Sequence, residues 1–289
     1  MRTKHSTLAG SIVGILSLGL LTGCGGPGEI RDPTPIATEF TELRIGISFD
    51  QPGLGVATEA GEEGGVVIGT DPKGFDVDTA LYIAKALGVA PDDVTWVKAD
   101  PVDREILLED GEVDMVLSTY TITDERAERV DFAGPYFVAH QDLLIRRNDE
   151  ELTGPDRLHG RTLCAAANTT SADNVLGQYR GDIALVQPDT FSDCVERLVA
   201  GDVDAVTTDD VILAGFAALP EYRGVLRVIG EGFSDEPYGV AVPKGSPELV
   251  DLINQALQSY IDDGSWEASL KINVGESGYK LPDPPSPGD

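Results

Sequence analysis

The feature that most limits the fold of this chain is an alternation of strand-like and helix-like segments that occurs twice along the sequence. In the first half, apolar runs at residues 43–47 and 94–97 flank residues 76–87, whose apolar side chains recur at helical spacing. Gly88 then provides a helix stop signal. Strands that alternate with helices form mostly parallel sheets, which carry ligand sites at the carboxyl ends of their strands.

The alternation starts again after the middle of the chain. Strands are expected at 161–166, 183–186, 203–207 and 238–242, and helices at 171–179, 192–200, 209–217 and 247–262. Two modules of this kind, the first completed by the C-terminal segment, predict an α/β protein with two mostly parallel sheets and a cleft between two lobes.

The amino terminus has the order of a secretory signal, with a basic start, an apolar run at residues 8–21 and small residues before Cys24. We therefore expect a signal peptide at residues 1–23. The letters LTGC resemble the lipobox of bacterial lipoproteins, which implies a lipid on Cys24 that anchors the protein to the outer face of the cell membrane. An uncut membrane anchor is the alternative, but the apolar run is short for a spanning helix. Residues 24–40 contain three prolines and little apolar pattern, which is typical of a flexible tether.

Charge and motif content exclude several classes of function. The chain carries 50 acidic and 21 basic residues, scattered rather than clustered, and the net charge of -29 disfavours binding to nucleic acid or anionic lipid. His5 lies in the expected signal peptide, and His140 and His159 have no spacing typical of a metal site. The sequence contains no nucleophile elbow, phosphate-binding glycine loop or HExxH motif. We therefore expect no catalysis, no cofactor and no metal.

The cysteine count suggests one cross-link. With Cys24 assigned to lipid, Cys164 and Cys194 remain in a protein exposed to an oxidising compartment, where disulfides form. We expect a disulfide between them. Two buried thiols are the alternative, because a free cysteine packs well in an apolar core.

A polar stretch at residues 114–137 is the strongest sign of a ligand site. Its apolar strand, 115–117, ends in hydroxyl-bearing residues and then enters a charged helix start that contains Arg126. Free backbone N–H groups and the positive end of a helix favour an anion there. A guanidinium can also donate two parallel hydrogen bonds to a carboxylate. The hydroxyl-bearing residues are Ser118, Thr119, Tyr120, Thr121 and Thr123. The alternative is an ordinary strand–turn–helix with Thr123 or Asp124 as the cap.

The segment STYTITDER, together with FDQPGLG, KGFDVD and DAVTTDDVILAGFA, resembles family 3 of the solute-binding proteins, and most of all the glutamate-binding lipoproteins of Gram-positive importers. The resemblance covers nearly all of residues 43–274. It implies the type II periplasmic-binding-protein-like fold, in which the chain crosses between the lobes twice. Residues 41–138 and 237–280 would then form lobe 1, residues 139–236 lobe 2, and residues 281–289 a C-terminal tail. It also implies an amino acid ligand, the permease subunits of an ABC transporter as partners, and a monomer.

The resemblance assigns the α-carboxylate of that ligand to Arg126 and Thr121. Residues 168–171 follow a strand and open a helix, so their backbone N–H groups, with Thr169 and Thr170, would add donors from the other lobe. A plain helix cap at Thr170 or at the next residue is the alternative there, and the two interpretations are compatible.

The α-ammonium needs a carboxylate. Asp209, at the end of an expected strand, is the first candidate, and Asp50 is the second. The alternative for Asp209 is a helix cap shared with Asp210. Phe75 could pack against the methylene groups of the ligand, or it could be a core aromatic residue at the start of a helix.

The resemblance points to glutamate or aspartate, and a second carboxylate in a cleft needs a second cation because a buried, unpaired charge is costly. Lys73 is the first candidate, Tyr120 could donate its hydroxyl, and Arg146 is a weaker choice. A solvated loop lysine is the alternative for Lys73. Two other functions share this fold, namely a periplasmic dehydratase acting on prephenate or arogenate and an extracellular amino-acid sensor domain.

Overall fold

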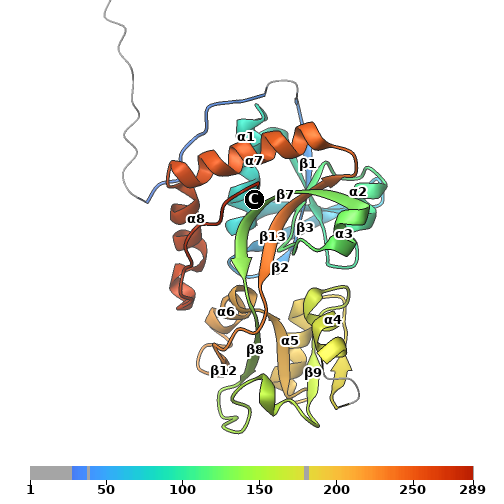
Figure 1. Cartoon of the computed structure of the whole chain (residues 1–289), viewed down its shortest axis with the longest axis vertical. Helices are drawn as coiled ribbons and strands as arrows, with labels where there is room; N and C mark the ends of the chain where they lie inside the picture. The colour runs from blue at the N-terminus through green and yellow to red at the C-terminus, as the bar shows by residue number, and fades with distance from the viewer. Residues whose placement is uncertain (1–27, 38–39, 179–181, 289) are drawn as a thin grey trace, which may run out of the picture.

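The computed structural model describes residues 28–37, 40–178 and 182–288, which form two lobes along the long axis of the molecule (Figure 1). The expected signal peptide and Cys24 lie outside the described residues. Within the described part of the chain, no helix combines the length and apolar character needed to cross a membrane. The predicted fold class, an α/β protein with two sheets flanked by helices, is confirmed. The expectation that both sheets are mostly parallel is wrong, because each sheet mixes parallel and antiparallel strand pairs.

Lobe 1 contains an eight-stranded sheet in the order β2-β3-β4-β5-β1-β6-β13-β7. Its strands are β1 (Leu43–Ile47), β2 (Asp50–Gln51), β3 (Gly55–Glu63), β4 (Val66–Lys73), β5 (Val94–Lys98), β6 (Met115–Leu117), β7 (Val130–Ala139) and β13 (Glu236–Pro243). Strands β5, β1 and β6 are parallel, whereas β13 runs antiparallel to both β6 and β7. A strand from near the end of the chain therefore completes the sheet between two strands from the first half.

Helices cover lobe 1, and much of its core is aromatic. The helices are α1 (Phe75–Ala86), α2 (Arg104–Glu109), α3 (Asp124–Arg129), α7 (Pro247–Asp262) and α8 (Ser265–Val274). The fully buried ring of Phe75 lies 5.7 Å from the ring of Phe137 and 5.9 Å from that of Trp266. Large rings in edge-to-face contact bury much apolar surface. Of the two interpretations of Phe75, the structure therefore shows the core residue.

Lobe 2 is smaller and has a five-stranded sheet in the order β10-β9-β11-β8-β12. Its strands are β8 (Gln141–Arg146), β9 (Thr162–Cys164), β10 (Ala184–Val186), β11 (Ala205–Asp209) and β12 (Leu226–Val228), and its helices are α4 (Thr170–Gln178), α5 (Phe191–Ala200) and α6 (Asp210–Ala218). A disulfide joins Cys164, at the end of β9, to Cys194 in α5. The cross-link expected from the cysteine count is therefore present, and it fastens a helix of lobe 2 to its sheet.

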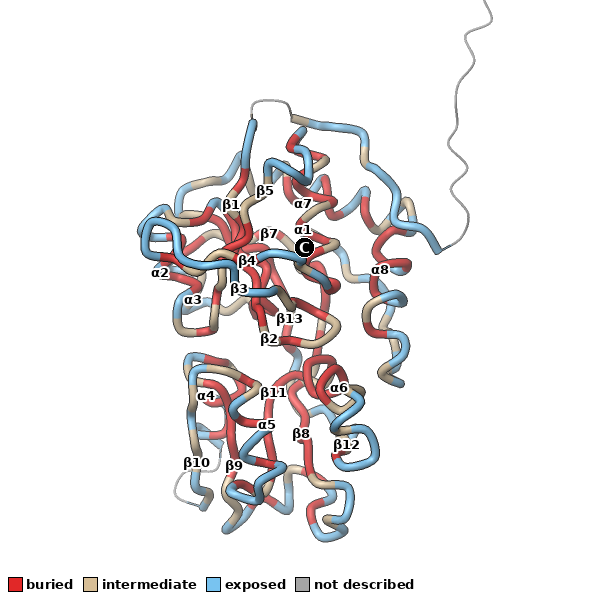
Figure 2. Tube along the Cα trace, turned by 180° about the vertical axis from the view of Figure 1, so that it is seen from behind, coloured by how far each residue is buried: buried red, intermediate tan, exposed pale blue. Residues whose placement is uncertain are grey.

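The hairpin of β3 and β4 is an element that the sequence interpretation missed. Strand β3 is exposed over most of its length (Figure 2), so its residues show no alternation between a buried and an open face. Gly64 and Gly65 lie between the two strands with φ angles of 63° and 97°. A two-residue turn with both φ angles positive favours glycine at both positions. This Gly-Gly pair is the sequence signal that identifies the hairpin.

Two extended segments connect the lobes (Figure 1). Strand β7 passes into β8 with His140 alone between them, and the chain returns to lobe 1 through β13. Glu236, the first residue of β13, pairs with Ala139, the last residue of β7. The two crossings are therefore hydrogen-bonded to each other, as expected for a hinge in which both segments move together.

Candidate functional site

A cavity between the lobes lies where β6 and β11 end. The residues that line it are Arg104, Thr119, Thr121, Arg126, Thr169, Thr170, Ser171, Phe191, Thr208 and Asp209. The free space is only about 10 Å³, roughly the room that one water molecule needs, because the two walls touch. The structure thus has a tightly closed cleft, and the lobes would have to move apart to admit an amino acid before they closed around it.

Arg126 reaches this cavity from the first turn of α3. Thr123 caps the helix by accepting a hydrogen bond from the backbone N–H of Arg126 at 3.2 Å. The guanidinium donates to the carbonyl oxygen of Thr121 at 2.8 Å, and its Nε lies 3.9 Å from a carboxylate oxygen of Glu105. The helix cap at Thr123 and an arginine that lines the cleft therefore coexist.

The loop between β6 and α3 is held in a strained shape by buried polar groups. Thr119 has a φ of 43°, which is unusual for a β-branched residue and costs roughly 1–3 kcal/mol. Its N–H donates to Asp76 at 2.9 Å, and its hydroxyl accepts from the amide of Gln51 at 3.0 Å. Burial raises the pKa of Asp76 to about 7, although the hydrogen bonds from Thr119 and Tyr136 oppose that shift. Asp76, in the KGFDVD motif, therefore helps to hold the loop that lines the cleft.

Tyr120 supports the wall rather than lining the cavity. Its hydroxyl donates to Glu105, and its fully buried ring lies under two guanidinium groups. The Cζ atoms of Arg104 and Arg126 lie 4.2 and 4.9 Å from the ring centroid. An aromatic face attracts cations at these distances. Arg104, which the sequence interpretation did not select, is thus the second cation of the cavity wall.

The start of α4 forms part of the opposite wall. Its cap is Thr169, whose hydroxyl accepts from the backbone N–H of Ala172 at 3.2 Å. Thr170, which was a candidate cap, instead donates its hydroxyl hydrogen to Glu236 at 2.7 Å. The hydroxyl of Ser171 is buried and has no hydrogen-bond partner. Buried polar atoms of this kind in a native fold call for an explanation, and a ligand is one.

Asp209 is the carboxylate of the lobe 2 wall. It is buried at the end of β11, and the hydroxyl of Tyr238 donates to it at 2.5 Å. Burial, followed by the nearby charge of Glu236, raises the pKa of Asp209 to about 8. Its side chain makes no cap bond to α6, whereas the carboxylate of Asp210 accepts from the N–H of Val211 at 2.8 Å. Asp209 is therefore available to the cleft.

The structure does not bring every candidate to the cavity. Asp50 lies at the lobe contact, where its carboxylate accepts from the N–H of Ser192 at 3.1 Å, but it is not a lining residue. Lys73 is exposed at the end of β4. Arg146 donates to the carbonyl oxygens of Leu198 and Val203, which ties it to the far part of lobe 2.

Contacts across the cleft converge on Asn168. This residue has a φ of 57°, and its carbonyl oxygen accepts from Nη2 of both Arg104 and Arg126 at 3.2 Å. Its side-chain amide donates to the carbonyl oxygen of Pro101 at 2.8 Å. The two arginines of lobe 1 therefore aim at a single point on lobe 2.

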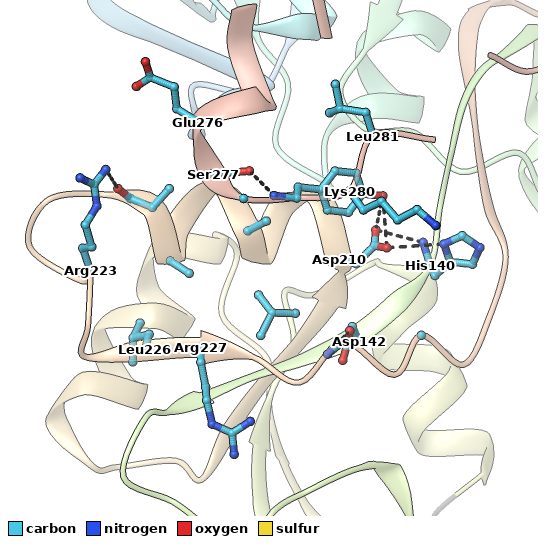
Figure 3. Close-up of a pocket in the computed structure, with 18 of the residues that line it drawn as sticks. His140, Asp142, Asp210, Arg223, Leu226, Arg227, Glu276, Ser277, Lys280 and Leu281 are labelled. Atoms are coloured by element: carbon cyan, nitrogen blue, oxygen red, sulfur yellow. Dashed lines mark hydrogen bonds and ion pairs between the residues drawn. The ribbon is translucent and has the colours of Figure 1, made fainter. Parts of the chain in front are cut away.

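A larger cavity, of about 770 Å³, lies outside the cleft, between lobe 2 and residues 276–282 (Figure 3). The hydroxyl of Tyr279 lies 3.2 Å from both carboxylate oxygens of Asp210. Arg223 and Arg227, which line this cavity, do not point toward a common site. Each donates to a backbone carbonyl, and the two side chains point in different directions (Figure 3). Among the described residues, no cluster of histidine, cysteine and acidic side chains could hold a metal ion. The cleft between the lobes is therefore the candidate ligand site.

Comparison with known proteins agrees with the two-lobed fold. The chain is 36% identical to the glutamate-binding protein GluB of Corynebacterium glutamicum over 98% of this chain and 95% of that protein. It is 26% identical to the ABC transporter glutamine-binding protein GlnH of Bacillus subtilis over 92% of this chain and 96% of that protein. A solved ancestral arginine-binding protein bound to glutamine superposes with a TM-score of 0.72 at 32% identity, over 82% of this chain and 99% of that chain.

The family model described as bacterial extracellular solute-binding proteins, family 3, matches residues 43–275. These residues include both lobes and every residue that lines the cleft. The chain therefore belongs to family 3 of the bacterial extracellular solute-binding proteins.

Proposed function

We propose that this protein is the receptor of an ABC importer for an acidic amino acid, glutamate first, and that a lipid on Cys24 holds it at the outer face of the cell membrane. Membership of the family makes it a solute-binding protein rather than an enzyme. The observation that carries the proposal is the placement of Arg126 and Asp209 on opposite walls of one cavity. This pair complements the α-carboxylate and α-ammonium groups that all amino acids share.

A ligand held in this way favours closure. Arg126 and Thr121 belong to lobe 1, whereas Thr170 and Asp209 belong to lobe 2, so one small molecule contacts all of them only when the cleft is closed. A ligand shifts a conformational equilibrium by its differential contacts, and these contacts exist only in the closed form.

The acidic preference is supported by two relatives named as glutamate-binding proteins, at 36% and 37% identity. Calorimetry of ligand-stripped protein against all twenty amino acids tests it. Glutamate or aspartate should bind at least tenfold tighter than glutamine and asparagine, a difference of about 1.4 kcal/mol. Tighter binding of glutamine, histidine or arginine would refute the acidic preference, and no binding of any amino acid would refute the receptor.

Anchoring is tested separately with Cys24→Ala in the full chain. Loss of the lipidated cysteine should release the protein into the medium or leave an uncleaved precursor, because one of these follows when the lipobox cannot be processed. Partitioning into detergent, with and without the substitution, is the measurement. Unchanged partitioning of a processed Cys24→Ala protein would show that no lipid on this residue holds it.

A further inference from the structure

The FDQPGLG turn of lobe 1, residues 49–55, touches helix α6 of lobe 2 at Gly215, outside the residues that line the ligand cavity. We propose that Gly215 is a positioning residue for closure, because it lets the FDQPGLG turn lie directly against α6 when the lobes close on a ligand. This inference rests on the proposed function, since it concerns the closure that accompanies binding, but it does not depend on which amino acid is bound.

Gly215 leaves no room for a side chain in the closed form. It is buried within α6, and a Cβ atom at this position would lie 2.1 Å from the carbonyl oxygen of Pro52, whereas non-bonded heavy atoms pack best at about 3.5–4.0 Å. The three atoms nearest to that Cβ all belong to Pro52, in the other lobe. Glycine is also a poor helix former, so a glycine inside a helix indicates a packing or functional requirement. The missing side chain at Gly215 is therefore what allows the lobes to approach this closely.

The FDQPGLG turn is held by lobe 1, so it has little freedom to move aside for a larger residue. Gly53 has a φ of 81°, and a Cβ atom there would lie 2.9 Å from the carbonyl oxygen of Asn273 in α8. The start of α1 donates two backbone hydrogen bonds, each of 3.0 Å, to the carbonyl oxygens of Gly53 and Leu54. A collision at Gly215 would therefore push the lobes apart rather than bend the turn.

The same turn connects this lobe contact to the ligand cavity. The side-chain amide of Gln51 donates to the hydroxyl of Thr119 at 3.0 Å, and Thr119 lines the cavity. On the side of lobe 2, the carboxylate of Asp50 accepts from the backbone N–H of Ser192 at 3.1 Å, near the start of α5, where a negative charge is favoured. Phe191, the first residue of α5, lines the cavity as well. A change in how the turn meets lobe 2 therefore reaches both walls of the cleft.

Calorimetry of the wild type, Gly215→Ala and Gly177→Ala with L-glutamate, L-glutamine and L-arginine tests the proposal. Gly177→Ala is the matched control, because Gly177 lies in α4 of the same lobe and a Cβ atom there would meet nothing within 4 Å. We expect Gly215→Ala to weaken every ligand that the wild type binds by about tenfold or more and by a common factor, because closure is shared by all ligands. Gly177→Ala should bind them as the wild type does.

A second readout separates incomplete closure from damage to the fold. Alanine is a better helix former than glycine, so the ligand-free Gly215→Ala protein, whose lobes can stay apart, should resist urea at least as well as the wild type. Small-angle scattering of the saturated proteins should give a larger radius of gyration for Gly215→Ala than for the wild type. A loss of ligand-free stability as large as the loss of binding free energy would show that Gly215 only packs lobe 2, and it would overturn the proposal.

The outcomes also separate this proposal from the function on which it rests. If the wild type binds an amino acid and Gly215→Ala binds it as tightly as Gly177→Ala does, the role of Gly215 is overturned and the receptor stands. If Gly215→Ala changes the order of preference among ligands, Gly215 acts on ligand selection rather than on closure, and the proposal is again overturned. If the wild type binds no amino acid, there is no closure on a ligand to control, and both proposals fail.

A measurement on the wild type keeps the proposal falsifiable if Gly215→Ala fails to fold, as judged by circular dichroism. Hydrogen exchange at the backbone N–H of Ser192 should slow when ligand saturates the protein, because its bond to Asp50 forms only when the turn meets lobe 2. Asp50→Ala should weaken all ligands by a common factor that is smaller than tenfold. Unchanged exchange at Ser192 on saturation would show that the turn does not meet lobe 2 in the ligand-bound form, which would overturn the proposal.

Discussion

The two walls of the cleft differ in charge and in how they are built. On lobe 1, the buried Arg104 and the partly buried Arg126 lie on the face of Tyr120, and a network through Asp76 holds the adjacent loop. On lobe 2, the start of a helix and one buried carboxylate, that of Asp209, face the cavity. The lobe 1 wall is thus cationic and is held by buried hydrogen bonds, whereas the lobe 2 wall combines a helix start with a single acidic side chain.

This difference between the walls predicts how the ligand is oriented in the cleft. Carboxylates are expected against lobe 1 and the α-ammonium against lobe 2, so a zwitterion links the walls and a simple anion does not. The two lobes also differ in what stabilises them. Lobe 1 has a large aromatic core, whereas lobe 2 has a small sheet and a disulfide. Four experiments test the comparison.

Arg126→Met should have the largest effect. Removing one member of a buried, hydrogen-bonded charge pair costs about 2–5 kcal/mol, so all amino acid ligands should lose roughly 30-fold or more in affinity. Calorimetry with glutamate, glutamine and alanine measures this loss, and an unchanged circular dichroism spectrum controls for folding. A loss confined to acidic ligands would show that Arg126 binds the side-chain carboxylate of the ligand rather than its α-carboxylate.

Removal of the disulfide should affect lobe 2 and spare lobe 1. The bridge joins residues 30 apart in sequence, and its loss in Cys164→Ser/Cys194→Ser should lower the free energy of unfolding by about 3–4 kcal/mol in the loop-entropy model. Hydrogen exchange followed by mass spectrometry should show faster exchange in α5 and β9 than in wild type. Equal acceleration in α1 and α7 would mean that the lobes do not differ in this way.

Asp209→Asn should weaken amino acids by about tenfold to a hundredfold, or about 1.4–2.8 kcal/mol, because the ammonium loses its only carboxylate among the lining residues described. Glutarate, which has two carboxylates and no ammonium, is the matched control ligand. Its weak affinity should be unchanged or improved by the substitution. A loss of glutarate binding equal to that of glutamate would place Asp209 in folding or closure rather than in ammonium recognition.

The smallest effect should be a dependence of stability on pH. The pKa of Asp209 is about 8 in the fold and about 4 in an unfolded chain, so its contribution to stability is complete below pH 4 and lost as pH rises through 8. Asp76, at about 7, acts in the same direction. The melting temperature of ligand-stripped protein should therefore fall between pH 5.5 and 8.5.

Asp209→Asn should reduce that fall by a few degrees, since 1 kcal/mol corresponds to about 2–4 °C in a protein of this size class. Repulsion among the many surface acids is common to both proteins and cancels in the comparison. Identical slopes in the two proteins would show that Asp209 does not titrate with folding.

Much of the fold could be predicted because local pattern and tertiary structure agree. The helix expected at 76–87 is Phe75–Ala86, and the one expected at 247–262 is Pro247–Asp262. The β3–β4 hairpin was missed because an exposed strand carries no periodic apolar signal. Helix α8, Ser265–Val274, was missed as well.

Part of the candidate site could also be predicted from the sequence pattern. Thr121, Arg126 and Asp209 line the cavity, and each lies at or just after the end of a strand, where sequence pattern predicts ligand contacts. Arg104 also comes shortly after a strand, β5, but it begins a short helix in an acidic stretch and belongs to none of the motifs, so only the folded chain shows that it reaches the cleft. Lys73 is the first residue of the KGFDVD motif, but it lies at the end of β4 and is exposed to solvent.

The position of β13 in the lobe 1 sheet has a consequence for how the protein is made. Lobe 2 is one continuous piece of chain, so all of its strands precede the segment that completes lobe 1. Lobe 1 is not continuous, because β13 must insert between β6 and β7, and β13 also supplies Tyr238 to Asp209. A chain that has emerged only as far as residue 235 therefore has all of its cleft-lining side chains and still lacks the strand that sets them facing one another. We therefore expect the capacity to capture a solute only once the C-terminal part of the chain has joined lobe 1.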